Sequence, residues 1–281
     1  MMLNNIKSLL ILGLLIGVVS LQSITLVSAK GLKNLNVLVY TKNGEGYVHD
    51  NIPFAVKSFQ KLGEEHKFKV TVSDDPGLFT EENLKQFNIL VFTSTNNDVF
   101  DTDEQRLAFR RYIQAGGGFV GLHSVVGTER NWEWFKMMIG GSFVWHPRFQ
   151  NYQLKVIDPS HPTVKNMPKV WEKEDECYFI KEVYPGIKVT IAHDLETLDQ
   201  DQKERIDASA APFSKLYPAV WHQNFDGGYI WISALGHHQK DYEDPVFLRH
   251  VVQGMEYVAS QIGKLDFSKA YATSRDAAVK Y

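Results

Sequence analysis

The chain has 281 residues, with 30 basic against 33 acidic side chains and a formal net charge of −3. This balance argues against a nucleic-acid partner, because such a partner needs a clustered basic face. The single cysteine, Cys177, excludes an internal disulfide, so the stability of the fold has to come from its core. A chain of this length is long enough for one large core.

The first 29 residues have the layout of a secretory signal peptide. Lys7 supplies positive charge, Leu9–Val19 form an uncharged apolar run, and Val27-Ser28-Ala29 matches a small-residue cleavage site. We therefore expect cleavage after Ala29, export to the periplasm or the extracellular space, and no stable membrane insertion afterwards. A retained membrane anchor is the alternative, because the apolar stretch continues loosely as far as Val27.

The first half of the chain alternates between predicted strands and predicted helices. Apolar runs predict strands at Asn36–Thr41, Lys69–Ser73, Ile89–Thr93 and Phe119–Leu122. Helix starts are predicted near Pro53, after the N-cap Thr80, and at the capping box that begins with Thr102. This alternation predicts an α/β fold with a doubly wound, mostly parallel sheet and helices on both faces.

The second half is less regular. Residues 125–150 indicate an elaborated loop with one short helix. Strands are predicted at Tyr152–Ile157, Val189–Ala192, Pro218–Gln223 and Tyr229–Ala234, and Asp244–Ile262 is predicted to be a closing helix. Gly227-Gly228 indicates a hairpin turn between the last two strands. We expect one domain over residues 30–263 and a polar surface tail over residues 264–281.

Two histidines are the main catalytic candidates because each follows a predicted strand. In doubly wound sheets, sites lie beyond the C-terminal ends of the strands. His123 follows the strand that ends at Leu122, and His237 follows the last strand. The sheet can bring the two imidazoles together, where they would transfer protons or bind a metal ion.

His146 and Glu176 extend this set. Two or three histidines with one carboxylate make an open metal site, which could hold zinc or another divalent ion. The candidate ligands are His123, His146, His237 and Glu176. The same groups would also make an acid/base constellation with Glu176 as carboxylate partner. No local His-x-x-x-His pair decides between these possibilities, so the cofactor stays open.

The remaining candidates are expected to bind substrate. His49 and Asp50 follow the first strand, although Asp50 could instead be the N-cap of the next helix. Tyr178 and Trp132 could stack on a sugar ring, although aromatic residues at such spacing often fill a core. Four other histidines are interpreted as turn or surface residues: His66, His161, His193 and His250.

Taken in order, these segments resemble the trehalose-utilisation (ThuA-like) family within the class I glutamine amidotransferase-like superfamily. The resemblance extends from Asn36 to Val258. It rests on the following segments: Val37–Thr41 with His49-Asp50, Ala115–Ser124, Phe143–Pro147, Ser160–Pro162, Asp175–Tyr178, Ala219–His222 and Leu235–His237. The resemblance implies a flavodoxin-like sheet and a role in bacterial disaccharide use, beside dehydrogenases that form 3-keto-glycosides.

The comparison with true glutamine amidotransferases implies that glutaminase activity is absent. In those enzymes the turn after the matching strand carries a cysteine nucleophile, assisted by a histidine after a later strand. Here that turn carries His123, and the only cysteine, Cys177, lies elsewhere. His237 occupies a place similar to the assisting histidine. Without a thiolate at this turn, no acyl intermediate can form there.

Three function hypotheses follow from the sequence. The first is an exported enzyme, a hydrolase or lyase, that acts on a small glycoside or an oxidised sugar through its histidine-rich site. The second is a non-catalytic carbohydrate-binding or scaffold protein on the same fold. The third is glycoside hydrolysis by paired carboxylates, for which Asp50 and Glu176 are the candidates. A homo-oligomer is compatible with all three.

Overall fold

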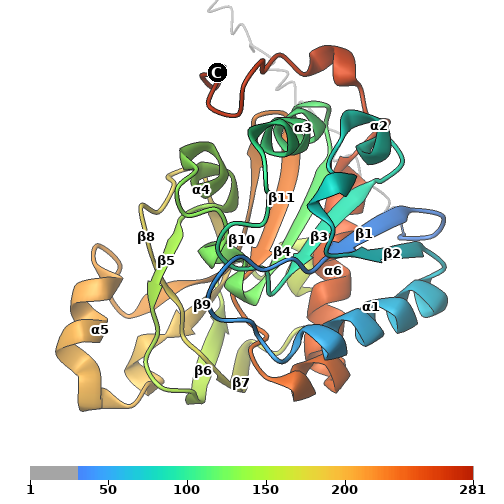
Figure 1. The fold of residues 1–281 in the computed structure, drawn as a ribbon. Helices are drawn as coiled ribbons and strands as arrows, with labels where there is room; N and C mark the ends of the chain where they lie inside the picture. Colours follow the sequence, from blue (N-terminus) through green and yellow to red (C-terminus); the bar gives the residue numbers. More distant parts are fainter. Residues whose placement is uncertain (1–30, 281) are drawn as a thin grey trace, which may run out of the picture.

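A computed structural model describes residues 31–280, so the predicted signal peptide over residues 1–29 lies outside the described residues. Within that part of the chain, a nine-stranded sheet has the order β2-β1-β3-β4-β11-β10-β9-β6-β7 (Figure 1). Its strands are β1 Asn36–Tyr40, β2 Lys69–Ser73, β3 Ile89–Thr93, β4 Gly118–Leu122, β6 Gln150–Val156, β7 Val170–Asp175, β9 Lys188–Asp194, β10 Leu216–Phe225 and β11 Gly228–Ser233. A small second sheet pairs β5 (Ser142–Trp145) with β8 (Phe179–Lys181).

The large sheet has a parallel half and an antiparallel half. β2, β1, β3, β4 and β11 are parallel neighbours. From β11 onward, β10, β9, β6 and β7 each run antiparallel to the strand before them. Two reversals restore the direction, so β9 and β7 point the same way as β11. The C-terminal ends of β1, β4, β11 and β7 therefore meet at one edge of the sheet.

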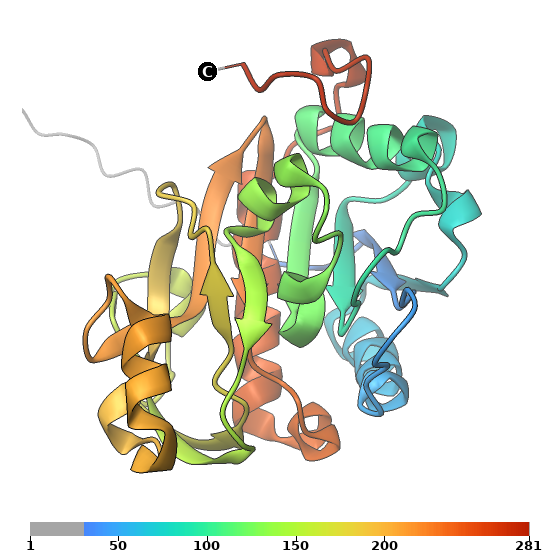
Figure 2. The same ribbon diagram turned by 60° about the vertical axis from the view of Figure 1, so that its left-hand side comes forward.

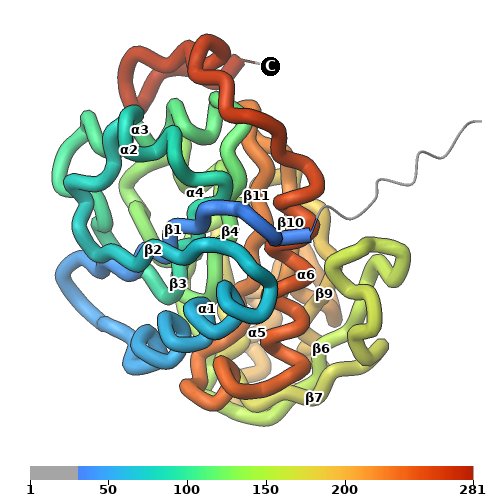
Figure 3. The backbone as a smooth tube through the Cα atoms, turned by 90° about the vertical axis from the view of Figure 1, so that its right-hand side faces the viewer, coloured from blue at the N-terminus to red at the C-terminus, as the bar shows by residue number. Residues whose placement is uncertain are grey.

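Helices cover both faces of the sheet. They are α1 Ile52–His66, α2 Glu81–Leu84, α3 Asp103–Gln114, α4 Glu133–Ile139, α5 Lys203–Ala210 and α6 Pro245–Gln261. α6 lies against one face of β4 and β11, and α3 and α4 lie on the opposite face (Figure 3). α5 lies beside the small sheet, at the left of the molecule in Figure 1 and nearest the viewer in Figure 2. No helix within residues 31–280 is long and apolar enough to cross a membrane.

The predicted α/β fold is confirmed, and the first half of the chain follows the predicted elements closely. Thr102 and Gln105 form the predicted capping box, and Thr80 caps α2 with its side chain. The helix at Asp244 also begins as predicted, with that residue as N-cap. The sequence reasoning missed β5, β7, β8 and α5. β7 has the sequence VWEKED and lies at the edge of the sheet. Its buried positions include Lys173 and Asp175, so the alternation of apolar and polar residues that indicates a strand is absent.

The C-terminal tail is fastened to α3 around a buried carboxylate. Asp226, in the turn between β10 and β11, accepts hydrogen bonds from Trp134, Gln114 and Tyr271. It also pairs with Arg110, whose side chain is fully buried. The tail is held by donors from α3: Arg110 donates to the carbonyls of Arg275 and Ala277, and Arg111 to those of Ala270 and Ala272.

Replacing Asp226 with asparagine should destabilise the protein by about 3–5 kcal/mol, because it leaves the buried Arg110 cation without its counter-charge. Asparagine keeps the shape of the side chain and tolerates the left-handed backbone at this position, where φ is 47°. Urea denaturation measures the effect. The control is Asp276→Asn, which removes an exposed ion pair and should change stability by less than about 0.5 kcal/mol. Equal stability of the two variants would contradict the assignment.

Candidate functional site

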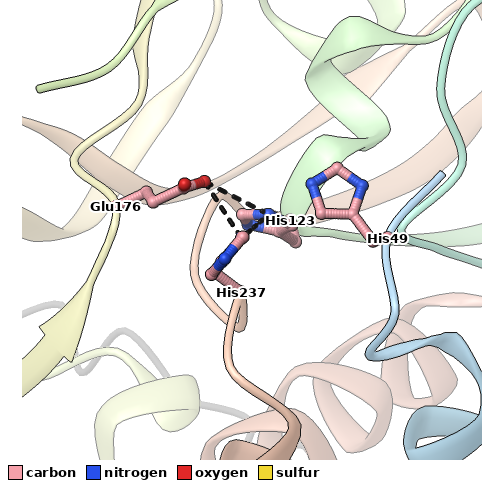
Figure 4. Close-up of side chains that lie close together, drawn as sticks. All are labelled: His49, His123, Glu176 and His237. Carbon is pink, nitrogen blue, oxygen red and sulfur yellow. Dashed lines mark hydrogen bonds and ion pairs between the residues drawn. The ribbon is translucent and has the colours of Figure 1, made fainter. Parts of the chain in front are cut away.

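Four side chains converge at the edge where the strand ends meet: His49, His123, Glu176 and His237 (Figure 4). Each offers one ligand atom, and these atoms all lie within 4.8 Å of one another. Nδ1 of His237 lies 3.0 Å from Oε2 of Glu176 and 3.3 Å from Nε2 of His123. Nε2 of His123 lies 3.8 Å from the same carboxylate oxygen.

The turn after β4 explains the position of His123. The residue has a φ of 52° and begins a short 3₁₀ helix, His123–Gly127. A left-handed backbone is uncommon for a residue with a side chain, and such strain clusters at functional sites. The turn directs the imidazole toward the strand ends instead of continuing the strand, and the residue is fully buried.

Asp175 holds the two segments that carry Glu176 and His237. Its carboxylate is fully buried and accepts hydrogen bonds from the backbone N–H groups of Glu176, Gly236 and His237, at 2.9, 2.9 and 3.1 Å. Lys173 lies 3.2 Å from the same carboxylate and supplies its counter-charge. The end of β7 is thereby locked to the loop after β11, although 61 residues separate Asp175 from Gly236.

Asn51 holds the loop after β1, which carries His49, against the loop after β11. Its side-chain amide donates to the carbonyls of Gly236 and His237, at 2.8 and 3.0 Å. The residue is the N-cap of α1 but makes no side-chain capping bond. An asparagine that would ordinarily cap its helix therefore ties the loop after β1 to the loop after β11.

The hydrogen bonds of Ser124 fix the tautomer of His49. The Ser124 hydroxyl has one hydrogen, and the Thr95 carbonyl 3.0 Å away can only accept it. Nδ1 of His49, 3.2 Å from the same hydroxyl, must then carry the hydrogen that it donates to Ser124. Burial, followed by the nearby His237, lowers the pKa of His49 to about 4. The ring is therefore neutral at pH 7, and Nε2 keeps its lone pair.

His123 and His237 differ in charge preference. Burial, then the neighbouring His49 and His237, lowers the pKa of His123 well below its ordinary value, so this ring is also neutral. Burial also acts to lower the pKa of His237, but the hydrogen bond and charge of Glu176 outweigh it and raise the pKa. The cluster thus combines two neutral imidazoles with one histidine that is paired to a carboxylate.

Tyr178 and His146 lie next to the four side chains of the cluster and contact them. The Tyr178 hydroxyl lies 2.9 Å from Nε2 of His123 and 3.3 Å from Nε2 of His49. Burial, with the charge of Glu176 next, raises its pKa well above the ordinary value, so the hydroxyl keeps its proton. Nδ1 of His146 donates to the Pro147 carbonyl at 2.7 Å, which leaves Nε2 facing Glu176 at 3.5 Å.

A pocket of about 380 Å³ opens beside the cluster. Its walls combine aromatic rings with polar groups: Tyr47, His49, Asn96, Ser124, Gly127, Arg130, Phe143, His146, Glu176 and Tyr178. A volume in this range and a mixed lining are typical of small-molecule sites. Among the described residues that line it, Glu176 is the single carboxylate and Arg130 the single permanent cation.

The separations within the cluster suit a transition-metal ion. Metal–ligand bonds of about 2.0–2.1 Å place neighbouring ligands of a tetrahedral site about 3.3–3.4 Å apart. The three separations among His123, Glu176 and His237 are 3.0, 3.3 and 3.8 Å, which bracket that value. Three imidazole nitrogens and one carboxylate oxygen form a donor set that suits zinc.

The structure brings together most of the residues that the sequence suggested. His49, His123, His146, Glu176, Tyr178 and His237 all lie at the cluster or line the pocket. Asp50 is exposed and outside the pocket lining, and the N-cap of α1 is Asn51. With Asp50 outside, the pocket lacks a second carboxylate for a paired-carboxylate glycosidase.

Trp132 also lies away from the pocket. It is 1% exposed, packs against Trp134 and Phe135, and donates to the Arg275 carbonyl. The interpretation of His193 and His250 as turn or surface residues is wrong, because both are fully buried. His193 lies within β9 and His250 within α6, so their rings pack against the core.

Sequence reasoning missed Arg130 and the two residues that fix the loops, Asn51 and Asp175. Asn51 directly follows the His49-Asp50 pair, and Asp175 directly precedes Glu176. Both residues could have been noticed because each is next in sequence to a residue already proposed for the site. Nothing in the local sequence marks Arg130, because its importance depends on which acidic residues lie near it in space.

Replacing Ser124 with alanine should allow His49 to adopt both neutral tautomers, because the Nδ1–H group loses its hydrogen-bond acceptor. Nitrogen NMR of the imidazole measures this directly. The wild type should show hydrogen on Nδ1 alone, and Ser124→Ala should show a mixture of tautomers. Ser58→Ala, a buried serine on α1, is the control and should match the wild type. Hydrogen on Nε2 of His49 in the wild type would refute the assignment.

Comparison with known proteins agrees with this fold. Residues 36–258 match the ThuA family, which is described as trehalose utilisation. A ThuA-like protein from Bacteroides uniformis is 21% identical, with a TM-score of 0.65 over 85% of this chain and 97% of that chain. One from Parabacteroides merdae is 19% identical, with a TM-score of 0.61 over 81% of this chain and 90% of that chain.

The fold also occurs within larger proteins. The β-galactosidase of Rahnella sp. R3 is 11% identical, with a TM-score of 0.51 over 82% of this chain and 32% of that chain, a likeness that concerns the fold alone. A search of curated proteins finds no match. Because the family match spans most of the chain, this protein belongs to the ThuA family, which connects it in broad terms with carbohydrate utilisation.

Proposed function

We propose that this protein is an exported enzyme that acts on a small sugar or glycoside and uses a divalent transition metal held by His49, His123, Glu176 and His237. The observation that carries the proposal is the convergence of four ligand atoms within 4.8 Å beside a pocket. Zinc fits the donor set best. Bound there, it would act as a Lewis acid toward a substrate oxygen or toward water.

The protonation states of two of the three histidines support metal binding, whereas His237 would have to release its proton to the solvent when the ion binds. A metal ligand must offer a lone pair, and His49 and His123 are neutral because burial lowers their pKa values. Metal-bound histidines ordinarily donate the other ring N–H to a fixed acceptor, which orients the ring. Ser124 plays that part for His49. The Thr95 carbonyl in turn orients the Ser124 hydroxyl, so the ring is aligned before any ion binds.

Two residues beside the cluster are suited to handle protons. Nε2 of His146 can accept a proton, because Nδ1 already donates to the Pro147 carbonyl. His146 lines the pocket, and its side chain is 33% exposed, so a substrate hydroxyl can reach it. Tyr178 keeps its proton and can donate a hydrogen bond to a substrate oxygen.

A sugar is the substrate class that the family and the pocket favour together. The family is described as trehalose utilisation. Tyr47 and Phe143 supply aromatic surface for the apolar face of a sugar ring, and Asn96 and Glu176 supply hydrogen-bonding groups. The apolar N-terminal segment, Leu9–Val19, with its cleavage pattern ending at Ala29, supports export.

Metal-free acid/base catalysis is the second candidate, favoured by the contact of 3.0 Å between His237 and Glu176. In that case Glu176 would hold the proton of His237 in place for transfer to the substrate. A non-catalytic sugar-binding protein would need neither a metal nor this pair. The measurements below separate the three possibilities.

Elemental mass spectrometry of the purified protein should find about one zinc or other transition-metal ion per chain, the ratio expected for one four-ligand site. His123→Ala should lose it, because it removes a buried ligand. His66→Ala removes a histidine at the end of α1 and should retain the ion. Absence of metal from the wild type, even after incubation with zinc, would exclude the metal site and leave the acid/base candidate.

Turnover should depend on the cluster and not on the rest of the fold. A panel of glycosides and 3-keto-glycosides is assayed with the wild type and with a variant carrying both His123→Ala and His237→Ala. The double variant should lose activity by at least about 10³-fold, the scale of losing a Lewis-acid metal or an acid/base pair. Its melting temperature is compared with that of the metal-free wild type and should be similar, because a bound ion would itself stabilise the wild type. Full activity of the double variant would refute the catalytic assignment.

A further inference from the structure

Arg130 is half-buried and has no carboxylate partner among the described residues, whereas each of the two buried arginines has one. Arg106 pairs with Glu129 at 2.7 Å, and Arg110 pairs with Asp226 at 3.3 Å. Arg130 is half-buried and forms no ion pair with any residue in the range 31–280. Its neighbour Glu129 cannot neutralise it, because that carboxylate is bound to Arg106 and to the backbone of Val99 and Phe100.

Neutral groups hold the Arg130 guanidinium in place. Nε donates to the Gly127 carbonyl at 2.9 Å, and Nη2 donates to the Asn96 side chain at 3.1 Å. The guanidinium carbon lies 5.3 Å from the centre of the Phe143 ring. Nη1 donates to no acceptor within residues 31–280, so its N–H groups remain available to a ligand. The cation is therefore fixed in position before a ligand arrives.

The fixed cation lies in the wall of the pocket that the cluster also lines. Burial lowers the pKa of Arg130, although an arginine stays charged near neutral pH. Burying a cation without a counter-ion is unfavourable, and an anionic ligand would relieve that cost. A planar carboxylate matches the fork of a guanidinium. A phosphate dianion is less suited, because Glu176 in the same pocket would repel its second charge.

We propose that Arg130 forms an anion subsite and that the substrate is an acidic sugar, a hexuronic acid or a glycoside of one. The carboxylate would bind at Arg130, and the hydroxyl groups of the ring would face Glu176, His146 and the metal cluster. This inference rests on the proposed function, since it names the substrate class for the same pocket. It makes Arg130 a specificity-determining residue.

Isothermal titration of the full protein tests the subsite with matched ligand pairs. Glucuronate and galacturonate are compared with glucose and galactose, and glucose 6-phosphate is the second anion. At least one uronate should bind at least about 10-fold more tightly than its neutral counterpart, the scale of a charge-assisted hydrogen-bonded pair. Equal affinities, or no uronate binding, would overturn the inference. Tighter binding of glucose 6-phosphate would overturn the carboxylate assignment.

Three variants connect the preference to the position of the guanidinium. Arg130→Gln should abolish the uronate preference, measured as the ratio of uronate affinity to neutral-sugar affinity in the same variant. Gly127→Ala should reduce the preference while the charge remains, because the added Cβ would lie 2.6 Å from Oδ1 of Asn96 and 2.9 Å from Nη2 of Arg130. Arg249→Gln, on the exposed side of α6, is the control and should behave as the wild type.

Two outcomes separate this inference from the proposed function. If Arg130→Gln keeps the uronate preference, the carboxylate binds elsewhere, for example at the cluster, and the subsite is wrong while the metal site stands. If the metal content of the wild type is zero but the uronate preference depends on Arg130, the subsite stands and the metal site is wrong. The melting temperature of each variant is measured first, so that a misfolded variant is recognised.

Discussion

The buried carboxylate of Asp175 is the constraint on which the site depends. It accepts backbone hydrogen bonds from the residue after it and from two residues of the loop after β11, and Lys173 balances its charge. A buried carboxylate without such partners would be very unfavourable, so the loop conformation and the ion pair require each other. The backbone groups that satisfy Asp175 belong to the residues that carry Glu176 and His237 into the cluster.

The site combines two electrostatic arrangements that face one pocket. In the first, neutral imidazoles present lone pairs beside a carboxylate, which is a favourable environment for a divalent cation. In the second, Arg130 presents a positive charge that no acidic side chain within residues 31–280 balances by an ion pair. A ligand with hydroxyl groups at one end and a negative charge at the other would complement both.

The fold itself says little about chemistry. The same fold occurs in ThuA-like proteins and within a β-galactosidase, where the matching region makes up 32% of the chain. Folds of this kind host many functions, so function has to be argued from the site. The turn at His123 illustrates the point. Its left-handed backbone presents a side chain at the sheet edge, and the identity of that side chain, an imidazole, determines which chemistry is available.

The sequence by itself determined the alternation of strands and helices, because apolar periodicity and capping residues act locally. It also determined that His123 and His237 follow strands, and the rule for wound sheets placed them at one edge. Only the tertiary structure decided that Trp132 belongs to the core and that Asp50 lies outside the pocket, since burial depends on distant neighbours. The same holds for Arg130 and Asp175. Whether a charge is balanced depends on residues that the chain brings close only when it folds, such as Glu129 with Arg106 and Lys173 with Asp175.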